Sequence, residues 1–243
     1  MTDFRTAYRD LEDRMRALAT ADGDVFLPIP EPLSPVQYIF ICMEPSLGGG
    51  TPEKARAEIE AGGRNFVNSI EDFLFHFSIR RYLCKPNERY HITDWSKGAM
   101  SVERAGIDRA RRYDRWYSLL IEEIDLVSLP NARLFAVGKD IEWHLVRHGF
   151  QRHVTMVIHY SRLAGAARAA SVVGHEHDYE QFRDSVSIED ILATAREVLE
   201  SSVPTRIRDL TLARLERRQL TESQRQLIFS YKLAFEREEP RMR

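Results

Sequence analysis

Short apolar runs alternate with amphipathic segments along most of this chain. Four runs are short and rich in β-branched and aromatic residues, which predicts buried strands. They span Gln37 to Met43, Tyr90 to Thr93, Arg133 to Val137 and Val154 to His159. The segments around them space their apolar residues as amphipathic helices do. Residues 4–20 are the clearest case, with Phe4, Tyr8, Leu11, Met15 and Leu18.

Further helices are expected wherever this spacing recurs. They cover residues 54–60, 66–83, 104–124, 141–148 and 187–201, with one or two more within 206–238. Buried strands separated by helices are typical of a parallel sheet covered by helices. We therefore predict an α/β fold of three layers, α/β/α, with a central four-stranded parallel sheet and extra C-terminal helices.

The length of the chain sets its expected domain organisation. The chain has 243 residues, of which 43% are hydrophobic, enough for one sizeable core with an appendage. We expect one α/β domain over residues 1–203 and a C-terminal helical extension over residues 204–243.

Charge is nearly balanced overall but uneven along the chain. The formal net charge is −2. Residues 204–243 carry ten Arg or Lys and six Asp or Glu, a net of +4, which leaves −6 for the rest. Residues 97–115 carry six basic and three acidic residues. Both segments could follow a phosphate backbone, or they could be solvated helix faces.

The cysteine count and the hydropathy exclude several classes of protein. Cys42 and Cys84 are too few for a disulfide framework or a four-thiolate iron–sulfur cluster. We find no signal peptide and no apolar run long enough for a membrane span, and therefore expect a cytoplasmic protein without membrane contact. Residues 175–178, His-Glu-His-Asp, offer two alternate histidines. A metal site usually needs three or four ligands, so we expect an exposed polar loop and no metal there.

Candidate chemistry lies where the predicted strands end, because functional loops of parallel sheets gather at that edge. His159 opens the segment His159-Tyr160-Ser161-Arg162-Leu163. Its imidazole could stabilise negative charge on a departing base. Ser161 could hold a phosphate, and Leu163 could fill the gap left by a flipped nucleotide. The alternative is a structural histidine after a buried strand.

Three other segments offer groups of the same kind. Glu44, after the first strand, could orient a water or stabilise a cationic sugar; the alternative is a solvent-exposed turn. Phe66, after Gly62-Gly63, could stack on an extruded base or be the first core residue of its helix. Asp94 leaves the second strand and could read the edge of a base or cap a following turn.

Taken in order, these segments resemble the motifs of the uracil-DNA glycosylase superfamily. Glu44-Pro45 resembles its acidic residue and proline after the first strand. Gly63-Arg64-Asn65-Phe66 resembles a Gly-Arg-Pro-Phe segment found in some members. Thr93-Asp94 with Lys97 resembles a Thr-Asn motif with a nearby lysine, and His159 to Leu163 resembles His-Pro-Ser-Pro-Leu.

The resemblance covers about residues 37–168 and implies an enzyme. A monofunctional DNA glycosylase would hydrolyse the N-glycosidic bond of a flipped base, with DNA as its partner and no metal or other cofactor. The implied catalytic residues are Glu44 and His159. Base contacts would come from Phe66 and Asp94, and DNA contacts from Lys97, Ser161, Arg162 and Leu163.

Two departures from the motifs bear on the substrate. Where the family reads uracil with asparagine, this chain has Asp94. An ionised carboxylate only accepts hydrogen bonds, so it would repel O4 of uracil and suit the exocyclic amine of cytosine. Where the uracil-specific branch has a tyrosine that blocks pyrimidine C5, this chain has Ser46, followed by residues 48–50, all glycine. Both departures predict a pocket for cytosine with a bulky C5 substituent, hydroxymethyl or glucosylated hydroxymethyl.

Such bases mark some phage genomes, so their removal would serve defence against phages. Three other interpretations stay open. The chain could be an ordinary uracil-DNA glycosylase of base-excision repair, a non-catalytic DNA-binding module of the same fold, or a hydrolase of nucleosides. The glycosylase hypothesis requires Glu44, Phe66, Asp94 and His159 to converge on one cavity.

Overall fold

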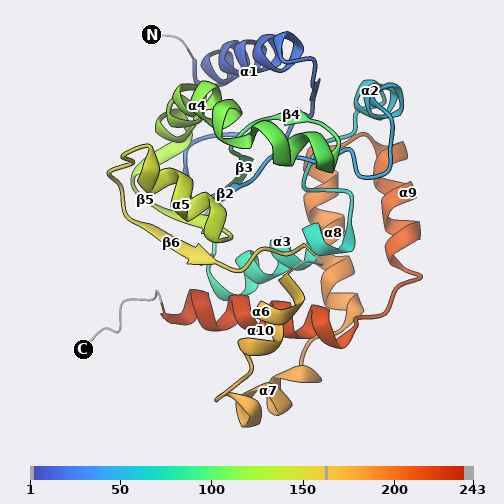
Figure 1. Cartoon of the computed structure of the whole chain (residues 1–243). Helices are drawn as coiled ribbons and strands as arrows, with labels where there is room; N and C mark the ends of the chain where they lie inside the picture. The colour runs from blue at the N-terminus through green and yellow to red at the C-terminus, as the bar shows by residue number, and fades with distance from the viewer. Residues whose placement is uncertain (1–2, 162–163, 238–243) are drawn as a thin grey trace. The chain divides into compact units, whose positions relative to one another are not determined.

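The computed structural model contains the expected alternation of strands and helices (Figure 1). It describes residues 3–161 and 164–237, with the side chain of Asp108 excepted. The helices are α1 (Phe4–Ala21), α2 (Pro52–Glu60), α3 (Ile70–Tyr82), α4 (Val102–Val127), α5 (Lys139–Arg147), α6 (Gly165–Ala170), α7 (Glu176–Arg183), α8 (Ile188–Ser202), α9 (Thr205–Leu215) and α10 (Glu222–Arg237). The strands are β1 (Val25–Phe26), β2 (Val36–Cys42), β3 (Tyr90–Asp94), β4 (Gly98–Ala99), β5 (Ser128–Val137) and β6 (Val154–Val157).

The chain forms two compact units, each built from two stretches of sequence. Unit 1 contains the described residues up to Asn65 together with Arg89–Met156, and unit 2 contains Phe66–Glu88 and the described residues from Val157 onward. This division differs from the expected boundary after residue 203. Helices α9 and α10 are no separate extension, because α9 packs on α8 and α10 packs on α3 within unit 2.

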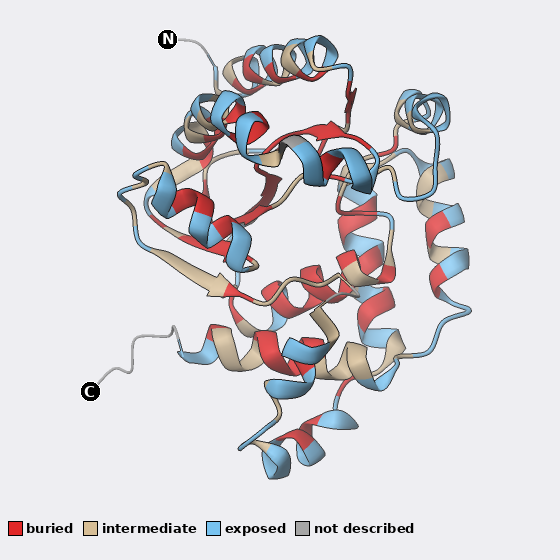
Figure 2. Cartoon of the chain, in the orientation of Figure 1, coloured by how far each residue is buried: buried red, intermediate tan, exposed pale blue. Residues whose placement is uncertain are grey.

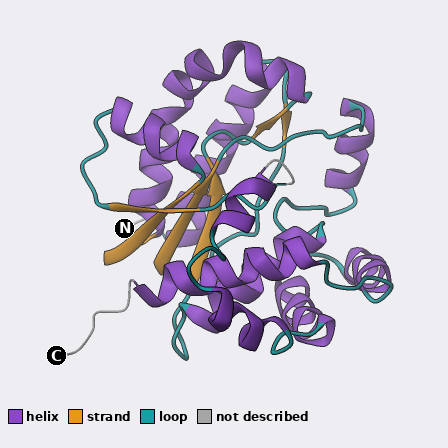
Figure 3. Ribbon diagram, turned by 60° about the horizontal axis from the view of Figure 1, so that its bottom comes forward, coloured by secondary structure: helices purple, strands orange, loops and turns teal. Residues whose placement is uncertain are grey.

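A parallel sheet of four strands, in the order β3-β2-β5-β6, confirms the predicted α/β class (Figure 3). The sheet is flanked by helices. In the central strand β2, Ile39 lies opposite His91 of β3 and Leu134 of β5. At the carboxyl edge, Cys42 pairs with Asp94. The first residues beyond β2 and β3 therefore leave the sheet at the same edge.

The core of unit 1 forms between this sheet and the apolar faces of α1 and α4. Its members include Leu11, Met15, Ile39, Ile41, Trp116, Leu120, Ile124, Leu134 and Ala136. The helical spacing predicted for residues 4–20 is confirmed by the burial of Tyr8, Leu11 and Met15. Strands β2 and β3 are buried along most of their length (Figure 2).

A small antiparallel ribbon of β1 and β4 was not predicted, because two-residue strands carry too little pattern. In it Val25 pairs with Ala99 and Phe26 pairs with Gly98. A Cβ at Gly98 would come within 2.7 Å of the Asp24 carboxylate. Glycine is therefore required where β4 passes Asp24.

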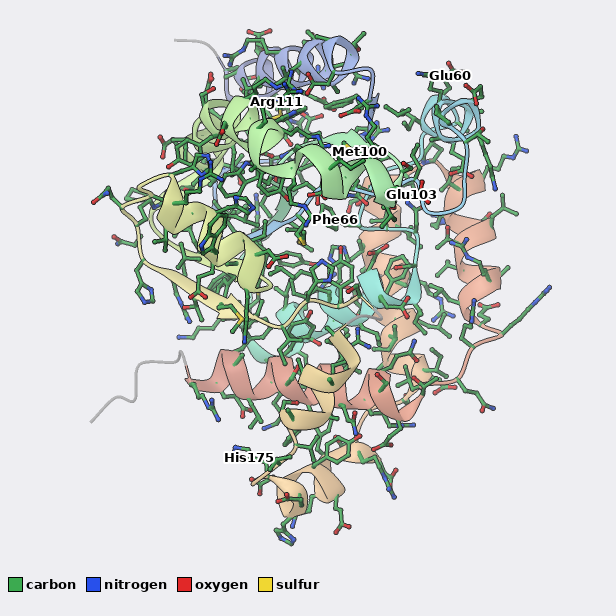
Figure 4. All side chains as sticks on the ribbon, viewed as in Figure 1. Glu60, Phe66, Met100, Glu103, Arg111 and His175 are labelled. Carbon is green, nitrogen blue, oxygen red and sulfur yellow. The ribbon has the colours of Figure 1, made fainter. Side chains whose placement is uncertain are left out.

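Unit 2 is built from helices around α3, against which α8 and α10 pack. Helix α3 begins four residues later than predicted, because Ser69 and Asp72 form a capping box at its start. The polar segment 175–178 was expected to be a loop, and this expectation is wrong. His175 (labelled in Figure 4) instead precedes helix α7. Among the helices described, none is both long and apolar enough to cross a membrane.

Candidate functional site

The predicted site residues are divided between the two units. Unit 1 holds Glu44, Ser46, Asp94 and Lys97, and unit 2 holds Phe66, His159 and Ser161. The predicted DNA-binding residues Arg162 and Leu163 lie outside the described residues. The convergence of Glu44, Phe66, Asp94 and His159 stays a prediction.

Asp94 ends strand β3 as a buried carboxyl group. The residue is 2% exposed, and its Oδ2 accepts a hydrogen bond of 2.6 Å from the side-chain amide of Asn65. The pair therefore places an amide group and a carboxyl group side by side at the end of β3.

The sequence predicts an ionised carboxylate at Asp94, but its surroundings favour the protonated form. Burial raises the pKa of Asp94 well above its ordinary value, and the charges of Glu44 and Glu123 raise it further against the opposing effects of Lys97 and Asn65. The raised pKa favours the neutral acid, which donates one hydrogen bond and accepts others. Because a neutral acid matches the edge of uracil as well as that of cytosine, charge repulsion alone does not exclude uracil.

A buried ion pair lies in the same network as Asp94. Glu123, on α4, accepts from Lys97 Nζ at 2.6 Å, from His91 Nε2 at 3.0 Å and from the Thr93 hydroxyl at 2.8 Å. Burial acts to raise the pKa of Glu123, but Lys97 and His91 outweigh it and lower the pKa to about 2. Glu123 is therefore an anion at neutral pH.

The predicted contact between Lys97 and DNA does not fit this position. The Lys97 side chain is 2% exposed. Its ammonium donates to the Asp94 carbonyl at 2.7 Å, to the Thr93 hydroxyl at 2.5 Å and to Glu123. An ammonium has three donors, and all three are used. Lys97 is an internal counterion that also fixes the backbone of Asp94.

Glu44 follows strand β2 and is held in one orientation. Its side chain is 4% exposed, which excludes a solvent-exposed carboxylate. Oε1 accepts from Arg109 Nε at 3.0 Å and Nη2 at 2.8 Å, and Oε2 accepts from the Tyr113 hydroxyl. Both partners lie on α4, and charge-assisted bonds of this kind restrain the carboxylate strongly.

Four of the basic residues of α4 pair with carboxylates inside unit 1. These pairs join Arg109 to Glu44, Arg104 and Arg112 to Asp24, and Arg115 to Asp22. These pairs neutralise much of the positive charge of residues 97–115.

Ser46 lies in an exposed turn after β2. Its hydroxyl accepts from the backbone N–H of Gly48 at 2.9 Å, and its backbone forms an isolated bridge with Met100. The small side chain leaves this loop without a bulky group at residue 46. Its contact with C5 of a base stays a prediction.

Phe66 is a buried residue with a strained, left-handed backbone conformation. The side chain is buried and the backbone has a φ of +62°, a left-handed value that is strained for an aromatic residue (Figure 4). Its carbonyl accepts from His76 Nε2 at 2.9 Å. Burial lowers the pKa of His76 to about 4, so the ring is neutral at pH 7. Phe66 is not the first residue of α3, which begins at Ile70.

His159 lies two residues beyond β6 in unit 2. Its Nδ1 accepts from the backbone N–H of Ser161 at 2.9 Å, and its ring stacks on Tyr160 with centroids 4.8 Å apart. A ring nitrogen that accepts carries no proton, so the proton of the neutral ring is on Nε2. Arg168 supports this loop by donating to the carbonyls of Tyr160 and Ser161.

The side chains that contact Asp94, Glu44 and Lys97 in unit 1 were not singled out from the sequence. They are Asn65, Arg109, Tyr113 and Glu123. Asn65 stands where the resembling motif has proline, and that departure was a usable signal. Arg109 and Tyr113 are four residues apart on a helix and so share one face. Glu123 was visible as an acid next to the apolar Ile124 in the core-facing stripe of α4.

Within residues 3–161 and 164–237, no group of three or more His, Cys, Asp or Glu side chains could hold a metal ion. Comparison with protein-family models, curated proteins and solved structures found no match in any of the three. The family resemblance therefore depends on the four sequence motifs alone.

Proposed function

We propose that this chain is a monofunctional DNA glycosylase that removes a flipped, C5-modified cytosine and leaves an abasic site. The buried Asp94–Asn65 pair at the end of β3 is the observation that supports this most. A carboxyl group and an amide side by side supply the donors and acceptors needed to read a pyrimidine edge.

Asp94 is proposed as a proton donor as well as a reader of the base. In the neutral form, its O–H donates to N3 of cytosine while its other oxygen accepts from the exocyclic amine. When the proton moves to N3 as the C1′–N1 bond breaks, the base leaves as a neutral molecule. Uracil already carries a hydrogen at N3 and cannot take the proton there. Proton transfer, in place of charge repulsion, then selects cytosine.

The remaining roles follow the chemistry of N-glycoside hydrolysis. Water adds to C1′ and loses its proton to solvent, from which the Asp94 carboxylate regains a proton, while the electrons of the C1′–N1 bond go to the base. Glu44, restrained by Arg109 and Tyr113, orients that water and supports the cationic sugar. His159 donates from Nε2 to O2 of the departing base. Phe66 stacks on the base, and no cofactor takes part.

The substrate class also suggests a biological role. Cytosines with C5 substituents distinguish some phage genomes from host DNA, so we assign the activity to defence against phages. Its partner would be DNA that enters the cytoplasm. A C5 substituent needs an uncharged, unobstructed space beside C5 of the base, and the small serine at position 46 is consistent with such a space.

The direct test is to incubate the protein with otherwise identical oligonucleotides. Single and double strands would carry uracil, cytosine, 5-hydroxymethylcytosine or its glucosylated form at one position. Alkaline cleavage would report abasic sites, and mass spectrometry would identify the released base. We expect release of C5-modified cytosine. Release of uracil alone would indicate a uracil glycosylase, and binding without release would indicate a non-catalytic module.

The Asp94→Asn variant tests the proton donor. Asparagine can still hydrogen bond but holds no transferable proton, so release of modified cytosine should fall by about 100-fold or more and preference should shift toward uracil. Because the pKa of Asp94 is raised, the active acid form is present below that pKa. Wild-type kcat/KM on cytosine should therefore decline as pH rises through it, and the variant should lack this decline.

The control for this variant is Asp184→Asn, a matching change at an exposed carboxylate in unit 2. It should leave base preference and pH profile unchanged. If Asp94→Asn also leaves both unchanged, Asp94 neither reads the base nor donates the proton.

A further inference from the structure

A cavity of about 620 Å³ lies wholly within unit 2. Its lining residues come from the start of α3, the end of α9, the start of α10 and Arg168 of α6. This volume is within the range of pockets that bind small molecules of nucleotide size. None of the proposed glycosylase residues lines it.

The side chains around the cavity are strongly basic. Arg168, Arg214 and Arg218 line it, against one carboxylate, Glu71. No ion pair joins any of the three arginines to a carboxylate in the described part of the chain. Glu71 itself accepts from the amide of Gln224 at 3.3 Å. The cavity therefore has an excess of positive charge that the protein does not neutralise.

Arg168 is the buried cation among the residues that line the cavity. It is 4% exposed, and its buried Nε has no hydrogen-bond partner among the described residues. Its Nη1 donates to the hydroxyl of Ser223, on the cavity wall, at 3.2 Å. Its Nη2 donates to the carbonyls of Tyr160 and Ser161, so within the described residues only Nε lacks an acceptor and no carboxylate balances the charge.

Two helices begin at the same cavity, where the backbone N–H groups of Asp72 and Gln224 already donate to the hydroxyls of Ser69 and Thr221. Ser69 precedes the first residue of α3, and Thr221 precedes the first residue of α10. These helices have 13 and 16 residues, long enough to carry a positive end at their N-termini. Hydroxyl groups of Ser69, Thr221 and Ser223 lie beside these helix ends.

We propose that this cavity binds a phosphate group of a nucleotide-sized ligand. Planar guanidinium groups pair with phosphate oxygens through two N–H donors, and helix N-termini favour the same anions. The phosphate could belong to a free nucleotide or to a nucleic acid strand, which share this chemistry. The inference is independent of the glycosylase proposal, because it requires no base release.

The test measures binding of dCMP and of a short single-stranded trinucleotide by calorimetry. The double variant Arg214→Gln, Arg218→Gln removes two charges from exposed side chains and so should keep the fold. Arg217→Gln is the matched control, since Arg217 is exposed, adjacent and absent from the cavity wall. Circular dichroism and thermal unfolding would verify that all three proteins are folded.

We expect wild type and Arg217→Gln to bind at least one probe with similar affinity, and the double variant to bind it about tenfold or more weakly. Binding of dCMP but not the trinucleotide would identify a free nucleotide as the source of the phosphate, and the reverse would identify a strand. The proposal is overturned if neither probe binds wild type, or if the double variant binds as well as the control does. Base release by all the proteins can be assayed separately, so each proposal can fail alone.

Discussion

The His159→Ala variant is expected to release base about 100- to 10,000-fold more slowly than wild type while binding DNA with similar affinity. The imidazole is proposed to act on charge that develops only as the glycosidic bond breaks. Its loss should therefore lower the rate of the chemical step and leave ground-state binding nearly intact. Single-turnover release of modified cytosine, with DNA affinity measured in parallel, checks both parts.

The tautomer of His159 gives this prediction a second measurement. Because Nδ1 accepts from the Ser161 backbone, only Nε2 is placed to donate. His159→Gln restores a side-chain N–H and should recover part of the rate lost in His159→Ala. His153→Ala, at an exposed histidine after α5, is the control and should have no effect. A His159→Ala rate within a few-fold of wild type would remove His159 from the mechanism.

The Lys97→Met variant is expected to lose about 3–5 kcal/mol of unfolding free energy, because it leaves the buried Glu123 anion without its cation. Adding Glu123→Leu should recover much of this loss, since the double variant contains no unpaired buried charge. Urea denaturation at neutral pH measures all the free energies. Lys54→Met, at an exposed lysine of α2, is the control and should change little.

The pH dependence of stability gives an independent check on this pair. The folded-state pKa of Glu123 is lowered to about 2, so its contribution is present above the ordinary glutamate pKa and is lost as pH falls toward 2. The double variant should lack this contribution to acid unfolding. Strictly additive losses in the two single variants and the double variant would show that Lys97 and Glu123 do not interact.

Periodicity and chain order predicted the sheet and most of the helices, because both depend on local patterns of burial. In strand β2 every apolar position is buried, and in helix α1 Tyr8, Leu11 and Met15 are buried while Phe4 and Leu18 are partly buried. The ribbon of β1 and β4 was missed because strands of two residues carry too little pattern. The expected boundary before α10 differs from the observed division because α10 packs on α3, α6 and α7, and α3 lies far away in the sequence.

The positions of Glu44 and Asp94 at the ends of strands were predicted from the sequence, but their partners and their electrostatics were not. Glu44 and Asp94 were located correctly after buried strands, since strand ends are visible in the sequence. Whether Asp94 is ionised depends on burial and on neighbours such as Glu123, which the chain supplies from a distant helix. Lys97 was misassigned to DNA for the same reason, because its partner lies 26 residues away.

The interleaving of the two units also sets an order for folding during synthesis. All the strands and helices of unit 1 have left the ribosome once residue 156 has emerged, apart from the last residue of β6. Unit 2 must wait for α10, whose Leu227, Ile228, Phe229, Tyr231 and Phe235 complete its interior against α3. Until then, the apolar side chains of α3 would be exposed in the nascent chain, between the two stretches of unit 1 that have already been synthesised. Such exposed apolar surface is a binding site for chaperones.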